Sequence, residues 1–180
     1  MSAPRSDIIG GMIEEGMRRL VAERACERLI YQYARFVDSG EAARIADLFT
    51  ADGVWTAADG RSMDGQDQIR AAFSARQALT RRLSRHVITN VLIDVHSDTE
   101  ATGTAYLVNY RHDGTGDTVE RPGPARHPKF VGDYHLEFRC VDGEWRITRL
   151  RFDLLFLRRS ESSAGGIQAR PSAAPFSPPP

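Results

Sequence analysis

The apolar residues of this chain change their spacing once, close to residue 80, and this change limits the folds open to it. Before that point they recur every three or four residues, as Cys26, Leu29 and Tyr33 do, which is the period of an amphipathic helix. Ser39-Gly40 ends the first such pattern, because glycine suits the left-handed conformation that closes a helix. The expected elements are helices over residues 13–37, 41–49 and 66–78, and a first strand beginning at 54–56.

After residue 80 the pattern alternates, which is typical of strands with one buried face. Tyr106 and Val108 fall on one face of such a strand, and Leu107 and Asn109 fall on the other. Asp142-Gly143 is a tight-hairpin signal between the last two strands. Helices followed by a meander predict an α+β fold with the helices on one face of a curved antiparallel sheet. The expected strands cover residues 84–95, 99–112, 130–140 and 145–157.

The length of 180 residues suits one domain with short flanking segments. We expect a flexible lead-in over residues 1–12 and one folded domain over 13–159. Residues 160–180 are rich in proline, serine and alanine, and their few apolar side chains cannot offset the entropy cost of ordering. A flexible tail is therefore expected there.

Charge and cysteine content exclude several classes of protein. The chain has 24 basic and 24 acidic side chains, and this balance argues against broad nucleic-acid binding, which needs an excess of cations. Two distant cysteines are too few for a disulfide framework or a zinc site. No apolar run is long enough to span a membrane, and no signal peptide is visible at the start. We therefore expect a cytoplasmic protein with no nucleic-acid or membrane partner.

Five short pieces of sequence occur in an order that is specific in combination. Together they resemble the nuclear-transport-factor-2-like superfamily and, within it, the SnoaL-like branch that includes scytalone dehydratase and hexachlorocyclohexane dehydrochlorinase. The resemblance implies a cone-shaped antiparallel sheet, a cystatin-like roll, with three N-terminal helices closing a pocket. The pieces are residues 31–38, residues 47–55, Gly65, residues 85–90 and residues 142–147.

The resemblance implies that Asp38 and His86 form a catalytic pair. Taken alone, Asp38 lies about 140° from the centre of the helical apolar stripe, which favours a solvated carboxylate. A lone histidine in a strand is likewise most often a structural hydrogen-bonder. When the two are paired, the carboxylate fixes the imidazole tautomer, and the other ring nitrogen becomes a general base.

Other residues match pocket positions of the same branch. By resemblance, Tyr33, Trp55 and Tyr134 line the substrate site, although Tyr33 and Trp55 suit a plain core equally well. Asn109 and Arg111 share one strand face, and there they could donate hydrogen bonds to a substrate oxygen. The alternative for Arg111 is an outward-facing salt bridge.

Two positions depart from the scytalone dehydratase pattern. Arg111 stands where that enzyme has a second histidine, and Ala57 stands where it has a tyrosine. The same substrate is therefore not expected here, while a His–Asp base is retained.

The sequence thus favours a cofactor-independent lyase or isomerase, of dehydratase or cyclase type. Its substrate would be a small hydrophobic cyclic molecule bearing a hydroxyl or carbonyl group. No cofactor and no metal are expected, and a homodimer or homotrimer is expected because an open curved sheet leaves an apolar outer face. Two alternatives stay open, namely the non-catalytic small subunit of a ring-hydroxylating dioxygenase and a small-molecule binding module.

Overall fold

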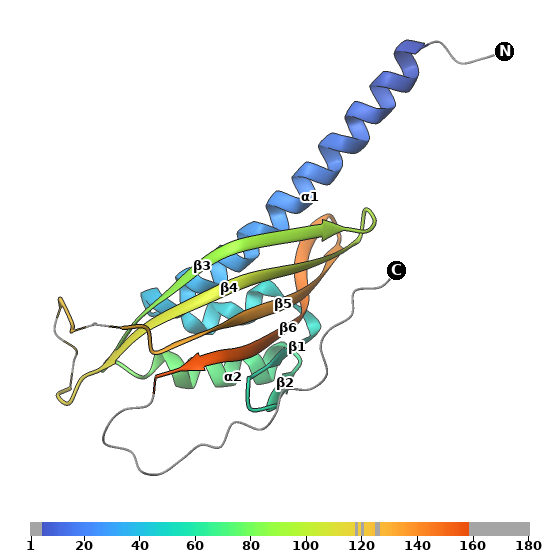
Figure 1. Cartoon of the computed structure of the whole chain (residues 1–180). Coiled ribbons are helices and arrows are strands. Elements are labelled where there is room, and N and C mark those ends of the chain that lie inside the picture. The colour runs from blue at the N-terminus through green and yellow to red at the C-terminus, as the bar shows by residue number, and fades with distance from the viewer. Residues whose placement is uncertain (1–4, 118, 120, 125–126, 159–180) are drawn as a thin grey trace.

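A computed structural model of the chain describes residues 5–117, 119, 121–124 and 127–158. In this range three helical elements lie on one side of a curved sheet (Figure 1). The expected tail over residues 160–180 lies outside the described residues. The elements are α1 (Arg5–Ser39), η1 (Ala42–Leu48), β1 (Phe49–Thr56), β2 (Ser62–Asp64), α2 (Gln66–Gln77), β3 (Arg82–Val95), β4 (Glu100–Asp113), β5 (Phe130–Val141) and β6 (Glu144–Leu157).

The six strands form one sheet in the order β2-β1-β6-β5-β4-β3. The four strands after residue 80 pair as the antiparallel meander that the alternation predicts. The expectation of a wholly antiparallel sheet is wrong at one place, because β1 runs parallel to β6 and Val54 pairs with Arg149. After β2 the chain passes through α2 to the opposite edge of the sheet, and the meander returns it to β1 in the parallel direction (Figure 1).

Two boundaries in the first half also differ from expectation. The short second helix is a 3-10 helix, and β1 already begins at Phe49 rather than at Val54. The three-residue strand β2 was not expected, since three residues are too few to show a period.

The core lies between α1, η1, α2 and the concave face of the sheet. Cys26, Ile30 and Tyr33 of α1 are almost fully buried, which confirms the apolar stripe of the first helix. Alternate residues of the long strands pack against them, and polar residues such as Ser84 and Asn109 take that face at one end of β3 and β4. The buried strand residues include Ala105, Leu107, Leu136, Phe138, Ile147 and Leu150.

Helix α1 begins at Arg5, so residues 5–12, expected as a flexible lead-in, are helical. The N-terminal part of α1 extends past the end of the sheet (Figure 1). Ile9, Met12 and Ile13 on it are each more than half exposed. Over the described part of the chain, no helix combines the length and the apolar character needed to cross a membrane.

Candidate active site at the end of the first helix

Asp38 lies in the last turn of α1, and its side chain is only 10% exposed. A helical wheel alone predicts a solvated carboxylate here. The structure differs because the first residues of β3 cross the end of α1 and cover it. The backbone N–H of His86 donates to Asp38 Oδ2 at 2.6 Å, and this bond fixes the carboxylate against the strand.

The side chains of His86 and Asp38 are in direct contact. His86 Nδ1 lies 2.7 Å from Asp38 Oδ1, and the His86 side chain is 12% exposed. An ionised carboxylate only accepts hydrogen bonds, so Nδ1 carries a hydrogen, and in the neutral imidazole Nε2 carries the lone pair. The structure therefore brings together the two residues that the resemblance pairs, in the geometry of an oriented imidazole base.

Asn109 sits on the other side of the imidazole. It pairs with His86 across β3 and β4, and its Nδ2 lies 3.2 Å from His86 Nε2. The same amide nitrogen lies 3.5 Å from the carbonyl oxygen of Arg85. Asn109 is 1% exposed, and its Oδ1 has no hydrogen-bond partner among the described residues. Asn109 thus contacts the dyad itself and presents an unsatisfied acceptor beside it.

The electrostatics keep Asp38 ionised. Burial acts to raise the pKa of Asp38, but the hydrogen bonds from His86 and Ser84 and the charge of His86 outweigh it. The net result is a pKa below the ordinary value of 3.8. Asp38 therefore remains a carboxylate throughout the neutral range and can stabilise an imidazolium at His86.

This lowered pKa predicts a specific acid dependence of stability. As the pH falls through 3.8, Asp38 is protonated in the unfolded chain before it is protonated in the folded one. The contribution of the Asp38 carboxylate to the free energy of unfolding is therefore lost between pH 3.8 and the lower pKa of the folded state. Urea unfolding is measured between pH 6 and pH 3. At pH 6 the free energy of unfolding of Asp38→Asn is expected to be lower than that of the wild type, and this difference is expected to narrow as the pH falls. Asp94→Asn, at an exposed carboxylate on β3, serves as control. A constant gap would contradict the assignment.

A cluster of aromatic side chains adjoins the dyad. Trp55 Nε1–H donates to the Tyr33 hydroxyl at 3.0 Å, and the Tyr33 and Tyr134 hydroxyls are hydrogen-bonded to each other. The Tyr33 ring meets Phe73 and Tyr134 edge-on, at centroid distances of 5.8 and 5.7 Å. Burial is the main cause that raises the pKa of both tyrosines, and the negative charge of Asp38 adds to it. Both hydroxyls therefore stay protonated at neutral pH.

Arg111 does not join this group. Its guanidinium binds Asp113, with Nε 2.9 Å from Oδ2, and Arg82 Nε binds the other oxygen of the same carboxylate at 2.6 Å. Burial acts to raise the pKa of Asp113, but hydrogen bonds from these two arginines and their charges hold it at about 2. Arg111 therefore forms the salt bridge that was its alternative reading.

Two residues of the site were missed in the sequence. The Ser84 hydroxyl donates to Asp38 Oδ1 at 2.9 Å, and Arg76 Nη2 donates to Ser84 Oγ at 3.1 Å. Ser84 lies two residues before His86, on the same strand face, so alternation could have identified it. Arg76 lies in the last turn of α2, and no pattern in the sequence connects it to β3.

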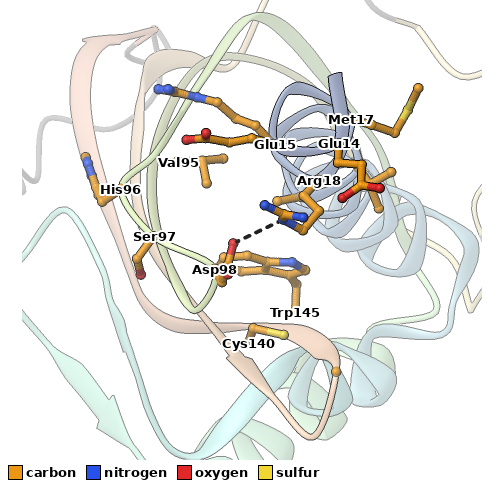
Figure 2. A pocket seen from close by; sticks show the side chains of 14 residues that line it. Glu14, Glu15, Met17, Arg18, Val95, His96, Ser97, Asp98, Cys140 and Trp145 are labelled. Atoms are coloured by element: carbon orange, nitrogen blue, oxygen red, sulfur yellow. Dashed lines mark ion pairs between the residues drawn. The ribbon is translucent and has the colours of Figure 1, made fainter. Parts of the chain in front are cut away.

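A hollow on the surface of the described residues lies away from the dyad. It has a volume of about 750 Å³ and lies between the first half of α1 and the far turns of the sheet (Figure 2). Arg18 and Asp98 form an ion pair of 4.0 Å across it. Charged and apolar side chains line it together, and none of the dyad or aromatic residues takes part. We therefore place the candidate site at the dyad, where the imidazole and the carboxylate are in contact, rather than at this hollow.

Comparison with known proteins gives the family-level result. The sequence profile of the SnoaL-like domain matches residues 18–151, which include both dyad residues. No protein with a curated description matches the chain. In the described residues, no three histidine, cysteine or carboxylate side chains gather as a metal-binding group.

Solved structures share the fold over most of their length. A Novosphingobium aromaticivorans protein provisionally named scytalone dehydratase is 24% identical, with a TM-score of 0.67, over 87% of this chain and 99% of that one. A second protein of that bacterium, an NTF2-like protein with a cystatin-like fold, is 22% identical, with a TM-score of 0.65, over 91% and 95%. A hexachlorocyclohexane dehydrochlorinase (LinA, type 2) is 16% identical, with a TM-score of 0.68, over 91% and 98%. These similarities confirm the expected cystatin-like α+β roll.

Proposed function

Because this chain belongs to the SnoaL-like domain family, and because a His–Asp dyad is formed inside its roll, we propose that it is a cofactor-independent lyase or isomerase. His86 is the general base and Asp38 is its orienting partner. The substrate is a small hydrophobic cyclic molecule with a hydroxyl or carbonyl group. The single observation that carries the proposal is the 2.7 Å contact of His86 Nδ1 with Asp38 Oδ1, which leaves the Nε2 lone pair as the base.

The reaction uses one proton transfer at Nε2. The lone pair takes a proton from the carbon next to the substrate carbonyl, and the electrons of that C–H bond form an enolate. Asp38 stabilises the resulting imidazolium. In a dehydration the enolate expels hydroxide from the next carbon, which leaves as water with the proton returned by Nε2, whereas in an isomerisation the proton returns to another carbon.

Asn109 and the tyrosines have parts in this scheme. The Asn109 amide can release Nε2 to the substrate while it keeps its contact with the Arg85 carbonyl. Its unsatisfied Oδ1 suits a substrate hydroxyl as a hydrogen-bond donor. The protonated hydroxyls of Tyr33 and Tyr134 suit a developing enolate oxygen, and the partly exposed Trp55 offers an aromatic wall to a ring.

The proposal is tested by proton exchange in heavy water. A panel of cyclic β-hydroxy ketones, with 3-hydroxycyclohexanone as the simplest, is incubated with the full chain and followed by proton NMR. Deuterium uptake next to the carbonyl, or loss of water to the enone, is expected above the rate given by Asp38→Asn. Equal rates for the wild type and that variant across the panel would argue against the proposal.

One observation favours a second candidate function, a module that binds a small molecule without converting it. The Asn109 amide nitrogen already contacts His86 Nε2, the nitrogen that would act as the base. A protein that only binds its ligand would show saturable binding of the same ketones without exchange. The other alternative is the small subunit of a ring-hydroxylating dioxygenase, and the molar mass from light scattering tests it. A self-contained enzyme is expected to form a homodimer or homotrimer. Stable assembly only with a larger iron–sulfur chain would favour the dioxygenase subunit.

A further inference from the structure

Four arginines lie around Ser84 at the edge of the dyad. Arg85 donates to the backbone carbonyl of Ser84 at 2.8 Å. The side chains of the other three, Arg76, Arg82 and Arg111, cluster with one carboxylate, Asp113, beyond Asp38. Arg82 and Arg111 both bind Asp113, with N–O distances of 2.6 and 2.9 Å. Strand pairing places Ser84 opposite Arg111 and Arg82 opposite Asp113, so these groups sit together by register. Asp113 thus already has two cationic partners, and the third cation, Arg76 on α2, reaches the cluster from the helix side.

Among the described residues, the hydrogen-bond partner of the Arg76 guanidinium is neutral. Its Nη2 donates to the Ser84 hydroxyl at 3.1 Å, and no carboxylate in the described part of the chain forms an ion pair with it. The Ser84 hydroxyl passes its own hydrogen to Asp38, so the serine separates the guanidinium from the dyad carboxylate. Of the five N–H donors of a guanidinium, one is used by this serine.

This environment disfavours the charge of Arg76. Burial is the largest cause that lowers the pKa of Arg76, and the charges of Arg82 and Arg111 add to it, while Asp38 and Asp113 act in the opposite direction. A half-buried cation beside two like charges is costly unless an anion pairs with it. Such a cost at a candidate site is typical of a group whose partner is a ligand.

We propose that Arg76 is the anchor of an anion-binding subsite beside the dyad, and that it holds the carboxylate of a small cyclic organic acid. The remaining donors of Arg76 form the planar fork that matches a carboxylate. One serine hydroxyl separates Arg76 from Asp38, so a ligand carboxylate held there places the ring of the ligand next to His86. The placement next to a base rests on the proposed function, while the anion preference does not.

The subsite is tested by binding without turnover. Benzoate and its neutral isostere benzamide are titrated into the full chain by isothermal calorimetry at low salt. The wild type is expected to bind benzoate about tenfold or more tightly than benzamide, and added chloride is expected to reduce that ratio. Equal affinities, or no benzoate binding, would overturn the proposal.

Substitutions on α2 assign the preference to one residue. Arg76→Gln is expected to bring the benzoate-to-benzamide ratio close to one, and Arg76→Lys to retain part of it, since a lysine keeps the charge without the fork. Arg70→Gln is the matched control, because Arg70 lies on the same helix and pairs with Asp47 at 2.8 Å, outside the site. An Arg76→Gln variant with the wild-type ratio overturns the assignment. Thermal melting of each variant checks folding, and Arg76→Lys still decides the question if the glutamine variant unfolds.

The two proposals fail in different experiments. Benzoate preference in a protein without proton exchange would leave the anion subsite in place and remove the lyase or isomerase. Exchange activity that needs His86, in a protein that binds benzoate and benzamide equally, would retain the base and remove the subsite. His96→Ala is expected to keep the benzoate preference, because the His96 ring bonds the Thr102 hydroxyl on the surface, away from Arg76.

Discussion

Replacing His86 by alanine is expected to lower kcat/KM in the proton-exchange assay by about 10²–10⁴-fold, the usual contribution of a positioned general base. The substitution removes the ring nitrogen that Asp38 orients, whereas the Ser84 hydroxyl still donates to the carboxylate. The loss is expected mainly in kcat, since the aromatic cluster that we propose as the substrate-binding wall remains. Deuterium uptake measured by proton NMR gives both parameters.

His96→Ala is the matched control for this variant. His96 follows the end of β3, and its ring bonds the Thr102 hydroxyl at 2.9 Å on the surface. Turnover is expected to stay at the wild-type level in His96→Ala and to be partly restored in His86→Ala by added imidazole. A His86→Ala variant with wild-type kcat would remove the dyad from the mechanism.

The largest expected effect on stability comes from Gly132→Ala. A Cβ at this position of β5 would lie 2.1 Å from the carbonyl oxygen of Asp153 and 2.6 Å from Phe152 Cε2. The first of these is backbone, so a rotamer change cannot relieve the contact and β5 must separate from β6. We expect the free energy of unfolding to fall by about 2–3 kcal/mol or more.

Urea unfolding monitored by circular dichroism measures this loss. Gly16→Ala is the control, because an added Cβ on this part of α1 meets nothing within 4 Å. Alanine in a helix is more favourable than glycine, so this variant is expected to gain about 0.5–1 kcal/mol. The same transition midpoint in Gly132→Ala and the wild type would show that β5 and β6 can separate at little cost.

The strands after residue 80 were predictable because each is long enough to show its alternation. The hairpin at Asp142-Gly143 then fixed where β5 ends and β6 begins, and Asp142 adopts the positive φ of 52° that such a turn requires. The start of α1 was not predictable in the same way. Gly10 and Gly11 weaken the helical pattern, and Ile9 and Met12 are exposed rather than part of the buried stripe.

The site was only partly accessible from the sequence. Asp38 and His86 came from resemblance, since the helical wheel placed the carboxylate on the wrong side and could not show that β3 covers it. Arg111 could have been assigned to its salt bridge directly, because Asp113 lies two residues on and shares its strand face. Arg76 required the structure, since only the folded chain brings the last turn of α2 within reach of Ser84.

The parallel pairing of β1 with β6 also sets the order in which this chain can be completed during synthesis. Phe49 pairs with Ile147 of β6, so a strand made early by the ribosome must wait for the last of the six described strands. Until then β1 has only the three-residue β2 beside it, and the backbone N–H and C=O groups of its other edge are unpaired in the nascent chain. Contacts this distant in sequence slow folding. A chain that stops within β6 therefore loses two strand pairings at once, and leaves both β1 and β5 as open edges.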